Sequence, residues 1–387
     1  MKLKKIENSN NLWDFIPDSI KKLHELFQNN GKKLYLVGGC VRDFLTGDTP
    51  HDFDLATDAL PDDILRILQG KYKINLQGKA FGVVVVYTKD QPSGIEIASF
   101  RRDISKGRNP EVELGVTIEQ DVNRRDITYN ALFYDLDKKQ IVDLTGGESD
   151  LKTGVTKMVG DPYERIDEDS LRILRAFRFA SRYNHPLHQD TELAIKKRKK
   201  LENIDPDTGE MKRISQERIW EEIKKSWTQA KDFNYYLNFF TKFDMWDEIF
   251  PGAEINTDLI KSNNFIIILA NLFRKNKNSD FLIKMIQDYK IESDLAIKVY
   301  FLISFLDFKS DNVYETYKKK LQSNISNDTI LEWIKVNNIQ DDKFVNFVNY
   351  KPTILASDLI NKGFKGADLG KEIKRLETEK FKKTLKK

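Results

Sequence analysis

The hydrophobic positions of the chain follow two patterns, and the change between them comes near residue 150. Before it, short apolar runs alternate with polar turns and a few segments of helical spacing, whereas helical spacing prevails from about residue 167 onward. The patterns predict strands at 34–37, 81–87, 95–100 and 141–144, early helices at 12–28 and 61–68, and breaks in the later helices at 203–209, 251–252 and 274–279. The sequence therefore predicts an α+β fold, with an N-terminal α/β domain followed by an all-helical region.

Composition narrows the class of protein without naming a partner. The chain has 387 residues, too many for one small core, so we expect at least two domains. Lys and Arg (64) nearly balance Asp and Glu (60), which permits nucleic-acid binding but does not argue for it. The only cysteine, Cys40, excludes an internal disulfide and fits a reducing compartment. Because no apolar run could span a bilayer and MKLKKIENSN lacks a secretory apolar segment, we expect a soluble cytoplasmic protein without a membrane partner.

One stretch, LYLVGGCVRDFLTGDTPHDFDLAT, carries most of the candidate chemistry. Gly38 and Gly39 follow the first predicted strand and open a short helix, so bare backbone N–H groups at the helix N-terminus offer an anion site. Asp52 and Asp54 fall in a second predicted strand, whose alternation places both carboxylates on one face. Such a pair repels itself unless a cation lies between, and Mg²⁺ is the usual cation for carboxylates and substrate phosphates. With Arg42 and the glycines on a triphosphate, this is the apparatus of two-metal nucleotidyl transfer.

Each of these features alone is more often structural, but their combination is specific. The stretch resembles the signature of class II tRNA nucleotidyltransferases, the CCA-adding enzymes of the polymerase-beta-type superfamily, which also includes bacterial poly(A) polymerases. That signature reads Leu-Val-Gly-Gly-x-Val-Arg-Asp-x-Leu-x-Gly, four residues, then Asp-x-Asp-x-x-Thr, and every position is matched from Leu36 to Thr57. The resemblance implies a nucleotidyltransferase palm (the head) at 1–150, then a helical neck, body and tail at 151–225, 226–310 and 311–387.

A second motif, RRDITYNAL, begins at Arg124. An Arg-Arg-Asp group at a helix start is commonly a surface ion-pair cluster. The string also resembles the second motif of the family, Arg-Arg-Asp-x-x-x-Asn-Ala-Leu, and the resemblance implies that Arg125 reaches the triphosphate. Asp126 and Asn130, spaced as i and i+4 on one predicted helical face, would contact the ribose hydroxyls.

A further motif, EDSLRILRAFRF, resembles the nucleotide-selecting helix of the family. We expect one helix that buries its leucines and phenylalanines and leaves its charged side chains as a polar stripe; the stripe and the preceding glutamate comprise Glu168, Asp169, Arg172, Arg175 and Arg178. Ordinary i, i+3 ion pairing on an exposed helix is the competing interpretation.

Hydrogen-bond chemistry favours a role in base selection. A carboxylate only accepts hydrogen bonds and a guanidinium only donates them. Cytosine and adenine both present an exocyclic amine next to an accepting ring nitrogen, so Asp169 and Arg172 would fit either base. Uracil and guanine present the reverse order and would leave buried groups unsatisfied. Arg175 and Arg178 would add positive charge near the base or the phosphates.

The remaining motifs are less specific. The resemblance implies a flexible loop at 101–110, linked to the switch from C to A addition, and a hinge at 143–151; Glu96 is a candidate third carboxylate or the partner of a loop arginine. Ser215 and the Glu217-Arg218 pair resemble the last motif of the family, Ser-x-Glu-Arg-Ile, for which we favour a structural role at a helix start. The Lys-rich segment 363–387 either tracks phosphates or is a solvated terminus.

These motifs together predict a transferase that adds CCA to the 3′ end of tRNA, using CTP, ATP and Mg²⁺ and releasing pyrophosphate. The tRNA acceptor region would bind the helical arm, while the oligomeric state is left open. A bacterial-type poly(A) polymerase is the nearest alternative, although the Gly-Arg-Arg-Phe string usual there is absent. Enzymes that add only CC or only A, and an inactive RNA-binding relative, are further alternatives; the intact Asp52, Asp54 and Arg125 argue against the last.

Overall fold

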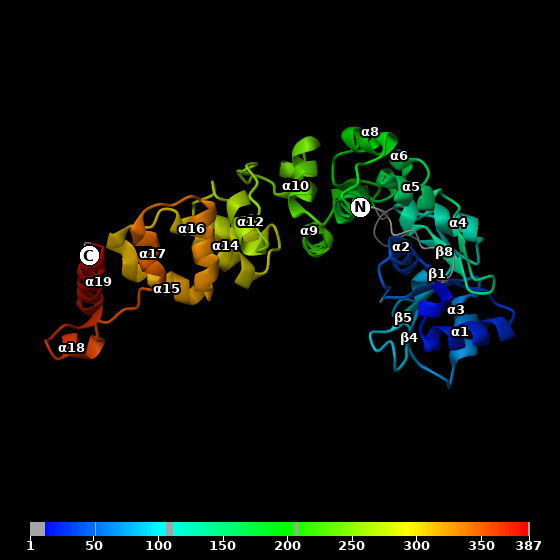
Figure 1. The fold of residues 1–387 in the computed structure, drawn as a ribbon, viewed down its shortest axis with the longest axis horizontal. Helices are drawn as coiled ribbons and strands as arrows, with labels where there is room; N and C mark the ends of the chain where they lie inside the picture. The colour runs from blue at the N-terminus through cyan, green and yellow to red at the C-terminus, as the bar shows by residue number, and fades with distance from the viewer. Residues whose placement is uncertain (1–11, 51, 106–110, 206–207, 386–387) are drawn as a thin grey trace. The chain divides into compact units, whose positions relative to one another are not determined.

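The computed structural model describes residues 12–50, 52–105, 111–205 and 208–385, and the chain divides into two compact units. The first unit ends at Met245 and the second begins at Trp246. A mixed β-sheet with helices forms most of the first unit, and the described part of the second is built from helices (Figure 1). The predicted α+β class is confirmed. The finer division into head, neck, body and tail stays a prediction.

The helices of the first unit include short 3₁₀ turns (η): η1 Leu12–Phe15, α1 Asp18–Asn29, α2 Gly39–Thr46, α3 Pro61–Leu68, η2 Lys79–Phe81, α4 Ile118–Asn123, η3 Thr128–Asn130, α5 Gly147–Thr153, α6 Pro162–Glu168, α7 Arg172–Tyr183, α8 Gln189–Lys197, α9 Gln216–Gln229 and α10 Phe233–Lys242. Its strands are β1 Leu34–Val37, β2 Asp54–Thr57, β3 Lys73–Asn75, β4 Val83–Tyr87, β5 Ile95–Ser99, β6 Arg101–Asp103, β7 Val112–Leu114, β8 Phe133–Asp135, β9 Gln140–Val142, β10 Glu202–Ile204 and β11 Met211–Arg213.

The main sheet has the strand order β3-β4-β5-β2-β1-β8-β9, so β1 and β2 lie near its centre. β1 pairs antiparallel with β2 and β8, whereas β2 pairs parallel with β5. Every residue of β1 is buried, as expected of an apolar run in a central strand. The predicted strands at 34–37, 81–87, 95–100 and 141–144 correspond to β1, β4, β5 and β9.

An aromatic cluster fills one face of this sheet. Tyr35, Phe100 and Phe133 meet with ring centroids 5.7 to 6.2 Å apart, and the rings of Phe100 and Phe133 meet edge to face. Val37 and Ala56 share this face and are also buried. The cluster fixes the ends of β1, β2 and β8 against one another, and these ends carry the candidate site.

Several predicted boundaries differ from the structure. The second predicted strand begins at Asp54, so Asp52 precedes it. Part of the predicted loop at 101–110 is strand β6, paired with β7, while residues 106–110 lie outside the described part of the chain. The predicted break at 203–209 lies within a hairpin formed by β10 and β11.

The helices of the second unit are α11 Trp246–Ile249, α12 Phe265–Leu272, α13 Asp280–Gln287, α14 Ser293–Phe305, η4 Ser310–Asn312, α15 Val313–Ser323, α16 Asn327–Val336, α17 Asp342–Val348, α18 Ala356–Ile360 and α19 Gly366–Thr384. The predicted breaks at 251–252 and 274–279 fall between helices, as expected.

Aromatic side chains also form the core of the second unit. Phe305 and Phe308 stack with centroids 5.5 Å apart, and Phe347 packs on both. Phe381 brings α19 to the same cluster, 6.0 Å from Phe308. The fully buried Glu377 of α19 accepts a 2.8 Å hydrogen bond from the hydroxyl of Tyr350. The Lys-rich last helix is therefore packed on the second unit along one side.

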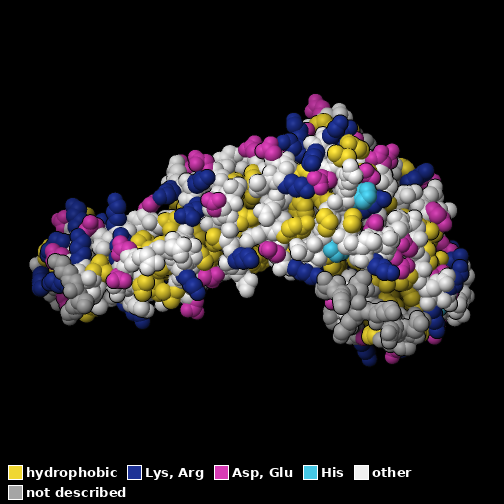
Figure 2. All heavy atoms as spheres, turned by 45° about the horizontal axis from the view of Figure 1, so that its top comes forward, with side chains coloured by type: hydrophobic (Ala, Val, Ile, Leu, Met, Phe, Trp, Pro, Cys, Tyr) yellow, Lys and Arg dark blue, Asp and Glu magenta, His cyan; other side chains and the backbone are white. Residues whose placement is uncertain are grey.

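The surface of the second unit carries charges of both signs. On the face drawn in Figure 2, Lys and Arg side chains alternate with Asp and Glu over this unit instead of forming a separate basic zone. In α19 some lysines are paired, such as Lys374 with Glu315 at 2.8 Å. Across the described residues, we find no helix with the length and apolar character that a membrane span requires.

Candidate active site

The predicted metal-binding carboxylates lie at one end of β2. Asp54 is its first residue, and the register Val37↔Asp54 places it beside the last residue of β1. The parallel register Leu55↔Ile97, continued by one residue, places Glu96 of β5 on the same face. Asp52 and Asp54 both retain solvent-accessible surface, although the surrounding protein removes part of the water around the carboxylate of Asp54. Partial burial, followed by the charge of Glu96 and then that of Asp52, raises the pKa of Asp54 to about 6, against the opposing charge of Arg125.

This edge fits a divalent cation by its donor chemistry. Neighbouring carboxylates repel one another, and a cation shared between them relieves this repulsion. Within the described residues, no three His, Cys, Asp or Glu side chains are grouped as a protein-only metal site. A hard cation held by Asp52 and Asp54 would thus take its other ligands from water or from a phosphate, as Mg²⁺ commonly does.

The Gly-Gly turn and α2 place a buried arginine next to this edge. Gly38 has φ +73°, a conformation that other residues rarely adopt, and Gly39 opens α2. Arg42 is 4% exposed and donates to Asp43 at 2.8 and 3.0 Å and to the side-chain oxygen of Asn130. Asp43 also accepts a 3.0 Å hydrogen bond from Arg182 of α7. The guanidinium of Arg42 is therefore positioned before any ligand binds.

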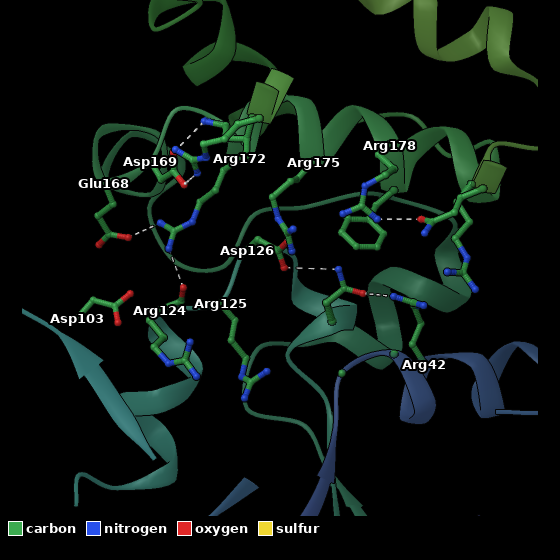
Figure 3. A pocket seen from close by; sticks show the side chains of 18 of the residues that line it. Arg42, Asp103, Arg124, Arg125, Asp126, Glu168, Asp169, Arg172, Arg175 and Arg178 are labelled. Carbon is green, nitrogen blue, oxygen red and sulfur yellow. Dashed lines mark hydrogen bonds and ion pairs between the residues drawn. The ribbon is translucent and has the colours of Figure 1, made fainter. Parts of the chain in front are cut away.

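A cavity of about 530 Å³ opens beside the Gly-Gly turn, and Figure 3 shows it from close by. All of the predicted nucleotide-binding residues line it: Gly39, Arg42, Arg125, Asp126, Asn130, Glu168, Asp169, Arg172, Arg175 and Arg178. Further lining residues that the sequence did not single out for this site include Arg101, Asp103, Arg124, Arg182, Arg218 and Gln229. Asp52 and Asp54 are not among the lining residues. The structure thus gathers the nucleotide-binding candidates in one arginine-rich cavity, with the carboxylate pair outside its wall.

One wall of the cavity is formed by Arg124 and Arg125, the two residues that come directly after α4. Asp121, only 1% exposed, accepts 2.8 Å hydrogen bonds from both Arg124 and Arg125. The guanidinium of Arg125 also lies 4.7 Å from the ring centre of Phe133, a cation–π arrangement. Asp121 therefore holds two arginines of the second motif in place. Its buried position between short elements gave no sequence signal.

The predicted helix through Asp126 and Asn130 is wrong. α4 ends at Asn123, and a single 3₁₀ turn, η3, follows at Thr128–Asn130. The two side chains still meet, because Asn130 donates to Asp126 at 3.5 Å. Burial would raise the pKa of Asp126, but Arg175 of α7, whose guanidinium contacts it at 2.6 and 2.7 Å, lowers it to about 2.

The predicted continuous helix over 168–178 is also wrong. α6 ends at Glu168 and α7 begins at Arg172, so Asp169 lies in the break between them. The carboxylate of Asp169 accepts three hydrogen bonds. The donors are Arg218 of α9 at 2.6 Å, the side-chain amide of Asn203 at 2.8 Å and the N–H of Leu171 at 3.2 Å. The sequence pointed to Arg218 only as part of a structural motif, whereas the structure places it on the cavity wall.

Arg172, Arg175 and Arg178 extend from α7 along the opposite side of the cavity from Arg125 and Arg42 (Figure 3). Arg172 donates to the carbonyl oxygens of its neighbours Arg165 and Arg124 at 2.9 and 2.8 Å and pairs with Glu168.

Arg178 does not belong to an exposed stripe. Its side chain is buried, with only 5% of the residue accessible to solvent. It donates hydrogen bonds to the buried Glu222 at 2.8 Å and to Gln229 at 2.9 Å, both on α9. Its guanidinium lies 4.2 Å from the ring centre of Phe179. The cavity therefore has an arginine layer whose members are each braced by a named carboxylate or carbonyl.

The hinge predicted at 143–151 coincides with the start of α5. The carboxylate of Asp143 accepts the N–H groups of Thr145, Gly146, Gly147 and Glu148 at 2.9 to 3.0 Å. Gly147 is packed so closely that a Cβ there would lie 2.3 Å from the carbonyl oxygen of Thr128. This turn packs against the backbone of Thr128, which lies between Asp126 and Asn130 in the chain.

Comparisons with known proteins agree with this geometry. Residues 34–157 match the family described as the Poly A polymerase head domain. A CCA-adding enzyme of Ligilactobacillus salivarius is 42% identical over 192 residues, which are 48% of this chain and 46% of that protein. Poly(A) polymerase I of Haemophilus influenzae is 32% identical over 62% of this chain and 52% of its own length.

Among solved structures, the fold resembles that of the CCA-adding enzyme of Bacillus stearothermophilus in complex with CTP, with a TM-score of 0.66 and 21% identity over 95% of this chain and 92% of that one. The CCA-adding enzyme of Thermotoga maritima complexed with tRNA_CCA gives a TM-score of 0.65 and 20% identity over 96% and 93%. A CCA-adding enzyme of Lactobacillus helveticus is 31% identical over 391 residues, which cover 94% of this chain and 93% of that protein. Because this similarity runs through nearly the whole of both chains, the chain belongs to the CCA-adding enzyme family of nucleotidyltransferases.

Proposed function

We propose that the protein adds C, C and A to the 3′ end of tRNA, taking the nucleotides from CTP and ATP without a nucleic-acid template. One observation carries this function. The cavity that holds the nucleotide-binding candidates presents an accepting carboxylate, Asp169, and a donating guanidinium, Arg172, at the break between α6 and α7. This polarity fits cytosine and adenine and opposes uracil and guanine.

In the reaction, the 3′-hydroxyl of the tRNA attacks the α-phosphorus of the nucleoside triphosphate. A new P–O bond forms, the bond to the β-phosphate oxygen breaks, the hydroxyl proton passes to solvent and pyrophosphate leaves. Arg42 and Arg125, with the N–H groups at Gly39, bind the triphosphate. Asp126 and Asn130 orient the ribose, and Arg175 keeps Asp126 ionised so that it accepts hydrogen bonds.

The family generally uses divalent metal ions, and we propose Mg²⁺ here, held by Asp52 and Asp54. When bound, such ions lower the pKa of the attacking hydroxyl and stabilise charge on the leaving pyrophosphate. The mutual repulsion at this edge, expressed in the raised pKa of Asp54, supports the assignment. The negative charge of Glu96 adds to that repulsion. We propose that it makes the electrostatic potential at this edge more negative and so favours cation binding by Asp52 and Asp54.

The helices after the head are proposed to bind the tRNA acceptor region, with the domain limits predicted at 151–225, 226–310 and 311–387. Exposed lysines of α19, such as Lys371, would contact phosphates without reading sequence. A cytoplasmic location is proposed from the composition of the chain.

Poly(A) polymerase activity is the second candidate, because the relative from Haemophilus influenzae carries that name. That similarity covers only 52% of the relative, whereas the similarity to a CCA-adding enzyme covers 93% of that protein. The full-length match is the observation that favours CCA addition.

One assay separates the candidates. Purified protein receives a tRNA that ends at the discriminator base, together with CTP, ATP or both, and the products are sized at single-nucleotide resolution. Extension by three nucleotides with both substrates is expected. Long tails with ATP alone would favour the poly(A) polymerase, and addition of only CC or only A would indicate a divided activity. Binding of tRNA without extension would indicate an inactive relative.

A further inference from the structure

The break between α6 and α7 is held by a side chain outside both helices. Asn203, on β10, accepts the backbone N–H of Ser170 at 2.8 Å and donates to the carboxylate of Asp169 at 2.8 Å. One amide thus contacts two successive residues of the break with its two ends. Ser170 is 2% exposed, so without Asn203 its N–H would be buried without a partner.

The same bond decides which oxygen of Asp169 can accept a further hydrogen bond. Oδ1 accepts both the amide of Asn203 and the N–H of Leu171, and each carboxylate oxygen has about two lone-pair sites. Oδ2 accepts Arg218 at 2.6 Å and retains one site. The Asn203 amide therefore leaves Oδ2 as the oxygen with capacity for the exocyclic amine of a base.

Asn203 is itself fixed by the hairpin. It lies opposite Lys212 in the antiparallel pairing of β10 and β11. Just outside the paired strands, the N–H of Ile214 donates a 2.8 Å hydrogen bond to the carbonyl of Leu201. At the other end, Asp205 accepts the N–H of Thr208 at 3.0 Å. The hairpin thus holds the amide group of Asn203 beside the break between α6 and α7.

We propose that Asn203 is a positioning residue for nucleotide selection: it sets the carboxylate of Asp169 in the orientation that accepts cytosine and adenine. This inference rests on the proposed function of the cavity and deepens it. Asn203 touches neither the triphosphate residues nor the carboxylates of β2, so its loss acts on base choice and leaves the joining chemistry in place.

The sharpest test is N203D. The new carboxylate keeps the shape and can still accept the N–H of Ser170, but it cannot donate to Asp169 and repels it. We expect the KM for CTP and for ATP to rise about tenfold, the size expected for one hydrogen bond to a charged group, while kcat changes less than about twofold. The preference for CTP over UTP, measured in competition on the same tRNA, should fall about tenfold.

N30D is the matched control, because it makes the same change at an exposed asparagine whose amide also donates one 2.8 Å hydrogen bond, to the carbonyl of Leu26, and which does not line the cavity. It should leave both KM values and the preference unchanged. N203A, which removes both bonds without adding charge, should lower the preference by a smaller factor. Circular dichroism of each variant establishes that it is folded.

The inference is overturned if folded N203D keeps the wild-type preference and KM values, or if kcat falls while KM stays constant. A wild-type protein that extends no tRNA would instead overturn the proposed function. In that case, calorimetric titration of wild type and N203D with CTP and Mg²⁺ still tests the inference. Equal affinities of the two proteins would contradict it.

Discussion

Two aspartates of the first unit, Asp54 and Asp126, occupy opposite electrostatic environments. Partial burial and two neighbouring carboxylates raise the pKa of Asp54 to about 6. Asp126 is more deeply buried, yet the guanidinium of Arg175 lowers its pKa to about 2. The first carboxylate lies where the fold concentrates negative charge, and the second lies where the fold already supplies the cation.

The difference separates the site for which we propose an external ion from a cavity whose charges are already paired within the protein. At the end of β2, a metal ion would relieve the repulsion, so we expect activity to depend on the concentration of divalent cations. In the cavity, arginines such as Arg42 and Arg178 are held by Asp43 and Glu222 before any nucleotide arrives. Preorganised charges require no rearrangement during the reaction, which suits groups that stabilise phosphates.

The largest expected effect comes from removing the carboxylates of β2. Asp54→Asn or Asp52→Asn should lower the rate of CMP incorporation about a thousandfold or more, because the metal contribution to transition-state stabilisation is several kcal/mol. Single-turnover extension of a tRNA lacking CCA measures this rate. Asp62→Asn, at an exposed carboxylate on α3, is the control and should retain activity. Incorporation within tenfold of wild type would refute the metal-site assignment.

The next effect concerns the turn that supports Asp126. In Gly147→Ala, the new Cβ would collide with the backbone of Thr128 and Tyr129, at 2.3 to 2.9 Å. We expect a loss of about 3 kcal/mol in the free energy of unfolding, at the upper end for overpacking. Gly146→Ala is the control: its φ is +78° but no atom lies within 4 Å of the added Cβ, so about 1 kcal/mol is expected. Equal losses in chemical denaturation would contradict the packing argument.

The paired environment of Asp126 predicts a specific acid sensitivity. Its folded pKa of about 2 lies below the ordinary value of 3.8, so its stabilising contribution is complete above pH 4 and is lost as the pH falls toward 2. The shift corresponds to about 2 kcal/mol. Unfolding of wild type and Asp126→Asn is compared in urea between pH 6 and pH 2.5. The free energies of unfolding of the two proteins should converge as the pH falls. A difference that stays constant with pH would show that Arg175 does not lower the pKa of Asp126.

The sequence predicted which residues line the cavity because those residues lie in short motifs, and the metal site at Asp52 and Asp54 stays a prediction. Gly39, Arg42, Asp52 and Asp54 fall within one strand–turn–helix–strand unit, whose local pattern fixes their arrangement. Strands β1, β2, β4, β5 and β9 and helices α1, α2 and α3 were likewise predictable from the local apolar pattern.

The helix break at Asp169 was not predictable, because it contains neither Gly nor Pro. It is made by hydrogen bonds: the side chain of Asp169 caps the N–H of Leu171, and Asn203 takes the N–H of Ser170 across 33 positions of sequence. The contact of Asp169 with Arg218 spans 49 positions. The supporting hairpin has three-residue strands with mostly accessible side chains, so no alternation marks it. Tertiary contacts of this kind leave no periodic signal.

The smallest expected effect tests the base-selecting end of the cavity. Asp169→Asn replaces an oxygen that only accepts by an amide that can also donate, so it can satisfy the carbonyl of uracil. We expect the preference for CTP over UTP to fall about tenfold, as for one hydrogen bond to a charged group, with little change in Mg²⁺ dependence. Competition between labelled nucleotides on one tRNA measures the preference. Asp167→Asn is the control, because Asp167 pairs with Arg198 at 3.0 Å and does not line this cavity. An unchanged preference combined with weaker Mg²⁺ dependence would assign Asp169 to the metal site and would remove the distinction between the two regions.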